Sequence, residues 1–180
     1  ALRDERFELM ELMAQLPSDL NFFTQITMES AEDPEFLKAM NKAHIRGALV
    51  GIEAVTPEGL KDVYKDFNLA GEDLVERLQM FRKYGVYILG SFIFGLPSDR
   101  PDTFDATAEL AKRADITFAQ FVTLTPFPGT LDFEQWEREE GDNMAKVDGI
   151  PVSRHWLIPQ AKRPKLLTLH PVMSGEQIRQ

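Results

Sequence analysis

Apolar and polar residues recur along this chain at two spacings, one typical of strands and one typical of helices. Strands are predicted at residues 21–28, 47–52, 86–94 and 117–124. The second is the clearest, because a short continuous apolar run is typical of a strand buried on both faces of a parallel sheet. The first is rich in aromatic and β-branched residues, which also favour a strand.

Helices are predicted between the strands, where apolar residues stand three or four positions apart. They cover the residues before Pro17, residues 34–43, 57–64 and 72–84, a segment opening at Pro101, and residues 131–140. Asp33-Pro34 and Thr56-Pro57 each combine an N-cap residue with a proline, which favours a helix start. Gly85 follows the fourth of these helices and is typical of a left-handed helix end.

This alternation of strands and helices predicts an α/β fold with parallel strands and right-handed crossovers. No glycine-rich turn follows the first strand, which favours a (β/α) barrel over an open doubly wound sheet. Four strands are too few to close a TIM barrel, so we expect a partial TIM-like barrel over residues 1–140. Residues 141–180 are predicted to form an irregular extension, in which Ser174 to Gln177 have the spacing of a capping box, so the chain is expected to stop within a helix.

Composition narrows the classes of function. The chain has 180 residues with 20 basic and 29 acidic side chains, and its net charge of −9 argues against binding to nucleic acid or an anionic membrane. No apolar run suggests a membrane span and no signal peptide is recognisable, so a cytoplasmic protein is expected. Without cysteine the chain supplies no disulfide or thiolate metal ligand, and its three histidines are not paired at metal-binding spacing.

Polar groups follow the predicted strands at their carboxyl ends, where parallel α/β folds place their sites. Glu53 follows a buried run, and its carboxylate is expected either to accept hydrogen bonds from a ligand or to cap a helix or pair with Lys65. Gly95-Leu96-Pro97 allows close approach to a flat ligand, although an ordinary strand-to-helix turn has the same pattern. The rigid turn at residues 126–129 would present Phe127.

Four segments in order resemble the later barrel strands of radical S-adenosylmethionine proteins, and most closely the branch with a cobalamin-binding domain. These segments are Val50-Gly51-Ile52-Glu53-Ala54-Val55, Lys65-Asp66-Phe67-Asn68, Gly90 to Pro97, and Leu124 to Thr130. The extension, with residues 154–159 and 170–174, is also similar to the segment that follows the barrel in that branch. Two departures are Ser91, where the family has a first glycine, and Asp99, where it often has another acidic residue.

The resemblance implies strands three to six of a six-stranded barrel. It also implies reductive cleavage of S-adenosylmethionine by a 4Fe-4S cluster to a 5′-deoxyadenosyl radical, with cobalamin-assisted methyl transfer to a small-molecule substrate in one branch. The cluster ligands, the missing N-terminal half of the barrel and a cobalamin-binding domain would lie outside this sequence. The chain alone is therefore expected to be inactive, and no catalytic residue is assigned within it.

The resemblance also implies roles for particular residues in binding S-adenosylmethionine. Gln25 would point into the barrel, Glu53 would face the ribose or methionine part, and Lys65 would lie near the carboxylate. The adenine would lie against Ile93, Gly95 and Pro97, and the wall would be completed by Thr125, Phe127 and Pro128.

Two other functions are compatible with the residues. An ordinary (β/α) barrel lyase or hydrolase would use Glu53 and Lys65 as acid and base, but a second convincing catalytic carboxylate is lacking. A degenerate barrel would serve only as a scaffold or binding module.

Overall fold

The computed structural model describes residues 3–65 and 72–179. Contacts divide the chain into two compact units, 1–122 and 123–180. This division does not coincide with the boundary expected after residue 140, and the division into barrel and extension stays a prediction. No helix among the described residues is long and apolar enough to cross a membrane.

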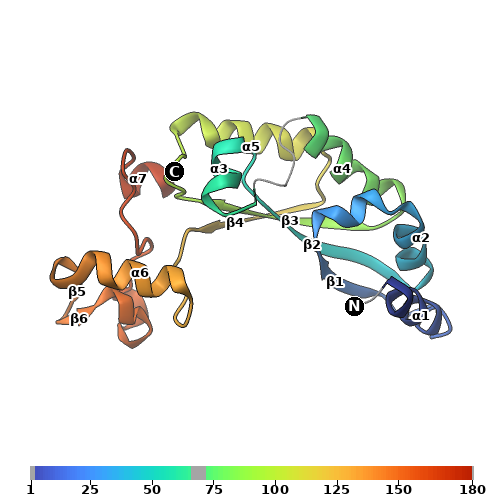
Figure 1. The fold of residues 1–180 in the computed structure, drawn as a ribbon, viewed down its shortest axis with the longest axis horizontal. Coiled ribbons are helices and arrows are strands. Elements are labelled where there is room, and N and C mark those ends of the chain that lie inside the picture. The colour runs from blue at the N-terminus through green and yellow to red at the C-terminus, as the bar shows by residue number, and fades with distance from the viewer. Residues whose placement is uncertain (1–2, 66–71, 180) are drawn as a thin grey trace. The chain divides into compact units, whose positions relative to one another are not determined.

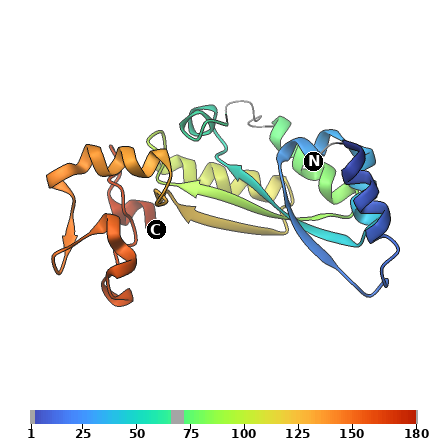
Figure 2. The same ribbon diagram turned by 60° about the horizontal axis from the view of Figure 1, so that its bottom comes forward.

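The first unit is built on a sheet with strand order β1-β2-β3-β4, shown in Figures 1 and 2. Its strands are β1 (Phe22–Ile26), β2 (Ile45–Glu53), β3 (Tyr87–Phe94) and β4 (Phe118–Thr123). β1 pairs with β2, and β2 with β3, in parallel. The strands are joined by η1 (Met28–Glu32) and the helices α2 (Pro34–Lys42), α3 (Pro57–Asp62), α4 (Glu72–Lys83) and α5 (Pro101–Arg113), and α1 (Arg3–Met13) precedes them.

Two of these helices begin as their sequences predict. The Asp33 carboxylate accepts a hydrogen bond from the Phe36 backbone N–H at 3.0 Å, at the start of α2. The Thr56 hydroxyl accepts one from the Gly59 N–H at 3.1 Å, at the start of α3. Each bond satisfies a donor that the first turn of a helix leaves without a backbone partner.

The two faces of the sheet differ, because side chains alternate along a strand. Ala48, Val50 and Ile52 of β2 are buried in the main core together with apolar residues of α2 and α4. The opposite face carries Phe23, whose ring lies so close to Gly47 that a Cβ there would stand 2.8 Å from it. Phe23 is 59% exposed, so this second face is incompletely covered.

The second unit has its own smaller core. It contains α6 (Leu131–Glu140), η2 (Gly141–Asn143), β5 (Lys146–Val147), β6 (Ile150–Pro151), η3 (Val152–Leu157), η4 (Gln160–Lys162) and α7 (Gly175–Arg179). Phe133, Trp136, Met144 and Val152 form the buried cluster. β5 and β6 pair as an antiparallel hairpin.

The strands and helices expected from the sequence are confirmed with end shifts of a few residues. The capping box is also confirmed, because the Ser174 N–H donates to the Gln177 side chain at 2.8 Å and the Gln177 N–H donates to the Ser174 hydroxyl at 3.3 Å. The β5–β6 hairpin was not expected. A mixed α/β fold with a parallel sheet is confirmed, whereas the numbering of its strands as three to six of a barrel stays a prediction. Asp66, Phe67 and Asn68 lie outside the described residues.

The exposed apolar residues of the sheet lead to a prediction about association. Phe118 of the edge strand β4 is 67% exposed, and we expect the chain to self-associate at high concentration. Replacing Phe118→Lys should weaken association at least about tenfold, because burying a phenylalanine side chain is worth about 1.5–3 kcal/mol. Sedimentation velocity over a concentration series measures this, with Leu131→Lys on α6, 82% exposed, as the matched control. Monomeric behaviour of the unmodified chain throughout would contradict it.

Candidate functional site

A cavity of about 190 Å³ lies at the carboxyl end of β1 and β2. It is lined by the end of β1 and the residues after it, by two residues near the end of β2, and by a lysine after α3: Gln25, Ile26, Thr27, Met28, Glu29, Gly51, Glu53 and Lys65. The structure therefore brings together three of the residues predicted from the sequence, Gln25, Glu53 and Lys65.

Glu53 is the last residue of β2 and has a left-handed backbone with φ of 68°. The pairing register of β2 with β3 shifts between Gly51 and Glu53, which accompanies this irregular strand end. Its side chain is 18% exposed, and its carboxylate accepts a hydrogen bond from the Lys65 Nζ at 2.7 Å. A positive φ is costly for a residue with a side chain and often marks a functional position.

Gly51 provides the space for this ion pair. A Cβ at position 51 would stand 2.4 Å from the Glu53 Oε1 and 3.2 Å from the Lys65 Nζ. A side chain there would displace both charged groups. The glycine is therefore favoured by the close approach of two side-chain ends, not by its backbone angle.

Lys65 reaches the cavity because the chain turns back at the end of α3. Tyr64 has a positive φ of 56°, and the Lys65 N–H donates to the Leu60 carbonyl at 2.8 Å. These two features end the helix and fix the backbone from which the lysine side chain starts.

Glu29, which follows β1, adds a second carboxylate that was not among the residues predicted for the site. The pKa of its carboxyl is lowered from the ordinary value of 4.5, chiefly by a hydrogen bond from the Thr27 side chain and then by its own backbone N–H. The positive charges of Lys65 and Arg77 lower it further. The carboxylates of Glu53 and Glu29 therefore both interact electrostatically with the Lys65 ammonium group.

The turn after β3 is held by a buried carboxylate. Gly95 has φ of 92°, and the Asp99 carboxylate accepts hydrogen bonds from the N–H groups of Gly95 at 2.8 Å and Leu96 at 3.0 Å. Asp99 is only 2% exposed. This fixing role was not predicted, although an aspartate shortly after Gly-Leu-Pro is a signal that could have indicated it.

The remaining predicted residues do not line the cavity. Ile93 is half-buried near the end of β3, and Gly95 and Pro97 belong to the turn that follows. In the second unit the Thr125 hydroxyl donates to the Thr123 carbonyl at 3.0 Å, Phe127 is 69% exposed, and Pro128 follows it. Their role in an adenine-binding wall stays a prediction.

The cavity combines two carboxylates, one ammonium group and the Gln25 amide. Such a set suits a ligand with hydroxyl donors, a positive charge, or both. Within residues 3–65 and 72–179, no group of three or more histidine, cysteine, aspartate or glutamate side chains has the geometry of a metal site.

The chain has sequence similarity to methyltransferases. It is 34% identical to the bacteriochlorophyllide d C-12(1)-methyltransferase of Chlorobaculum tepidum, over 71% of this chain and 27% of that protein. It is 33% identical to an uncharacterized methyltransferase of Pyrococcus horikoshii, over 59% of this chain and 22% of that protein. With the hopanoid C-2 methylase of Rhodopseudomonas palustris it shares 27% identity, over 73% of this chain and 25% of that protein. The matches span about a quarter of these relatives, and no protein-family model matches the sequence.

Solved structures show the same fold. The radical S-adenosylmethionine methyltransferase TsrM of Kitasatospora setae, solved with cobalamin and a 4Fe-4S cluster, superposes with a TM-score of 0.63 at 23% identity, over 82% of this chain and 31% of that one. The cobalamin-dependent radical enzyme OxsB, solved with aqua-cobalamin and S-adenosylmethionine, gives a TM-score of 0.52 at 14% identity, over 78% and 20%. The fold of this chain is therefore that of a part of these cobalamin-dependent radical S-adenosylmethionine enzymes, and the expected resemblance is confirmed.

The turn after β3 yields a first prediction for this region. Replacing Asp99→Ala should lower the free energy of unfolding by about 1.5–3 kcal/mol, because two backbone N–H groups lose a charged acceptor. Urea unfolding measures the change, and Asp102→Ala, at an exposed position in the first turn of α5, is the control. Equal effects of the two substitutions would contradict the role of Asp99.

A second prediction concerns the charges in the cavity. Lys65→Met should raise the pKa of Glu29 towards its ordinary value, because a positive charge that favours the carboxylate is removed. Since the folded-state pKa is lowered, the ionised carboxylate stabilises the fold above its unfolded-state pKa, and this contribution disappears as the pH falls through the folded value. Carbon-13 NMR titration of the glutamate carboxyls measures the shift, with Lys61→Met as control. An unchanged Glu29 pKa in Lys65→Met would contradict the proximity.

Proposed function

We propose that this chain forms part of the S-adenosylmethionine-binding half of a radical S-adenosylmethionine methyltransferase. The observation that carries the proposal is the Glu53–Lys65 ion pair beside Gly51, at the carboxyl end of a parallel sheet with the fold of such enzymes. Polar groups at this edge are where parallel α/β folds bind ligands. The methyltransferase relatives support methyl transfer as the reaction.

The chemistry of the cavity fits part of S-adenosylmethionine. The ribose of S-adenosylmethionine presents hydroxyl donors, the methionine part carries an ammonium and a carboxylate, and the sulfonium is positive. Glu53 and Glu29 are acceptors for the hydroxyl and ammonium groups, and Lys65 is a donor for the carboxylate. At about 190 Å³ the cavity holds a portion of the molecule, and the adenine would extend towards Ile93 and the Gly95-Leu96-Pro97 turn.

The residues of this chain do not fit the 4Fe-4S cluster, because the sequence contains no cysteine. We infer that the cluster ligands and the remainder of the barrel come from elsewhere in the whole protein, as does any cobalamin-binding domain. When bound, the cluster would supply the electron that cleaves S-adenosylmethionine. The contribution of this chain is to bind and orient the nucleoside and methionine parts.

The methyl acceptor is proposed to be a small molecule with large apolar surface. Two relatives act, by their names, on a bacteriochlorophyllide and on a hopanoid. The net charge of −9 disfavours a polyanionic acceptor.

The proposal predicts the effect of one substitution in the whole, cluster-bearing protein. Glu53→Gln should keep the fold and weaken S-adenosylmethionine binding about ten- to a hundredfold, because a hydrogen bond to a charged acceptor is worth about 1.5–3 kcal/mol. Equilibrium dialysis under anaerobic conditions measures the affinity.

Glu58→Gln is the matched control, because Glu58 is exposed in the first turn of α3 and lies outside the cavity. Its affinity should equal that of the unmodified protein. Unchanged affinity in Glu53→Gln would remove Glu53 from the site. Absence of any S-adenosylmethionine binding by the unmodified whole protein would overturn the proposed function and favour a scaffold.

A further inference from the structure

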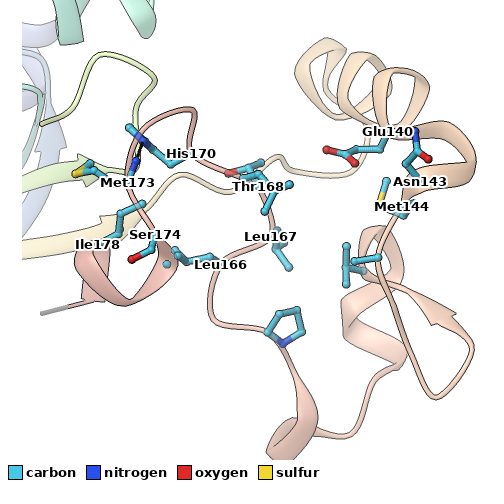
Figure 3. A pocket seen from close by; sticks show the side chains of 15 residues that line it. Glu140, Asn143, Met144, Leu166, Leu167, Thr168, His170, Met173, Ser174 and Ile178 are labelled. Atoms are coloured by element: carbon cyan, nitrogen blue, oxygen red, sulfur yellow. Dashed lines mark hydrogen bonds between the residues drawn. The ribbon is translucent and has the colours of Figure 1, made fainter.

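A second cavity, of about 280 Å³, lies wholly within the second unit (Figure 3). In this view Leu166, Leu167 and Thr168 lie between Met173 and Ile178 at the left and Asn143 and Met144 at the right. The volume is close to the lower end of the range for small-molecule sites, about 300–1,000 Å³. The cavity is therefore large enough for one ring system or a short alkyl chain.

The wall of this cavity is mainly apolar. Four lining residues, Met144, Val152, Met173 and Ile178, are each at most 8% exposed, and Leu166 and Leu167 add to the apolar surface. Ordered water needs two to four polar partners, which the apolar part of this wall does not offer. The space is thus better suited to an apolar group than to water.

The lining of the cavity has few polar groups, and hydrogen bonds to the backbone hold one of them, the His170 ring, in place. The His170 Nδ1 accepts hydrogen bonds from the backbone N–H groups of Val172 at 3.1 Å and Met173 at 2.8 Å. These two bonds fix the imidazole ring, and in its neutral form they place the proton on Nε2. Glu140 and Asn143 contribute a carboxylate and an amide. A largely apolar cavity with a few placed polar groups is the usual composition of a small-molecule site.

We propose that this cavity binds an uncharged apolar portion of the methyl acceptor, such as a ring edge or an alkyl side chain. The inference rests on the proposed function and deepens it by naming the chemical class that the second unit recognises. His170, Glu140 and Asn143 would select the orientation of any polar substituent on that portion. The Glu53 cavity is lined by other residues and is not required for this binding.

The test uses the 180-residue chain and the neutral fluorescent probe N-phenyl-1-naphthylamine, because an anionic dye would be repelled by the net charge of −9. The methionine methyl groups, labelled with carbon-13, report where the probe binds. Met144 and Met173 line the cavity, and the other five methionines all belong to the first unit. Saturable shifts restricted to Met144 and Met173 are expected. Shifts that spread over the other five, or that never saturate, would overturn the proposal.

A pair of variants tests the location by affinity. Thr168→Phe adds bulk inside the cavity and should weaken probe binding at least about tenfold, whereas Val172→Phe adds a ring outside the lining and should change it less than about twofold. Equal affinities in the two variants would overturn the proposal. The proposal would also be overturned if the NMR signals of Met144 and Met173 shifted without probe as the protein concentration was raised. Such shifts would mean that a second copy of the chain fills the cavity.

The outcome is separable from that of the proposed function. Probe binding needs neither the cluster nor S-adenosylmethionine, so its absence beside normal S-adenosylmethionine binding in the whole protein would overturn only the present inference. Normal probe binding beside absent S-adenosylmethionine binding would overturn only the proposed function.

Discussion

Burial of one face of β2 against the helices is the constraint on which the first unit depends. Ala48, Val50 and Ile52 are all at most 2% exposed, and strand geometry then assigns the intervening residues to the opposite face. A slip of one residue would expose those three side chains and bury Glu53 without a partner. The same pattern that forms the core therefore fixes the face on which Gln25, Gly51 and Glu53 lie.

The cavity and the turn after β3 also depend on backbone irregularities at the ends of elements. Glu53, Tyr64 and Gly95 all have positive φ, and they stand at the ends of β2, α3 and β3. Only Gly95 is a residue that adopts this conformation without cost. The cost at Glu53 and Tyr64 is offset by local contacts, among them the Glu53–Lys65 ion pair and the bond from the Lys65 N–H to Leu60.

Sequence patterns predicted most elements because their signals are local. The apolar run of β2 and the caps at Asp33 and Thr56 each lie within a few neighbouring residues. The hairpin of β5 and β6 was missed although Asp148-Gly149 is a recognised turn signal, because strands of two residues are too short to show alternation. The sharing of Lys65 between Glu53 and Glu29 was only partly predictable, since it depends on how the sheet aligns distant segments.

The Glu53–Lys65 pair limits which ligands the first cavity accepts. A carboxylate only 18% exposed is expensive to leave without a partner, and the lysine ammonium now meets that need. A ligand that covers the cavity with a negative group would draw Lys65 away from Glu53. Such a ligand must therefore also present a positive group or strong hydrogen-bond donors to Glu53. Glu29 strengthens this requirement, because the same lysine also interacts with its carboxylate. A simple anion would draw Lys65 away and leave Glu53 without its partner, so the arrangement favours ligands that carry both charges.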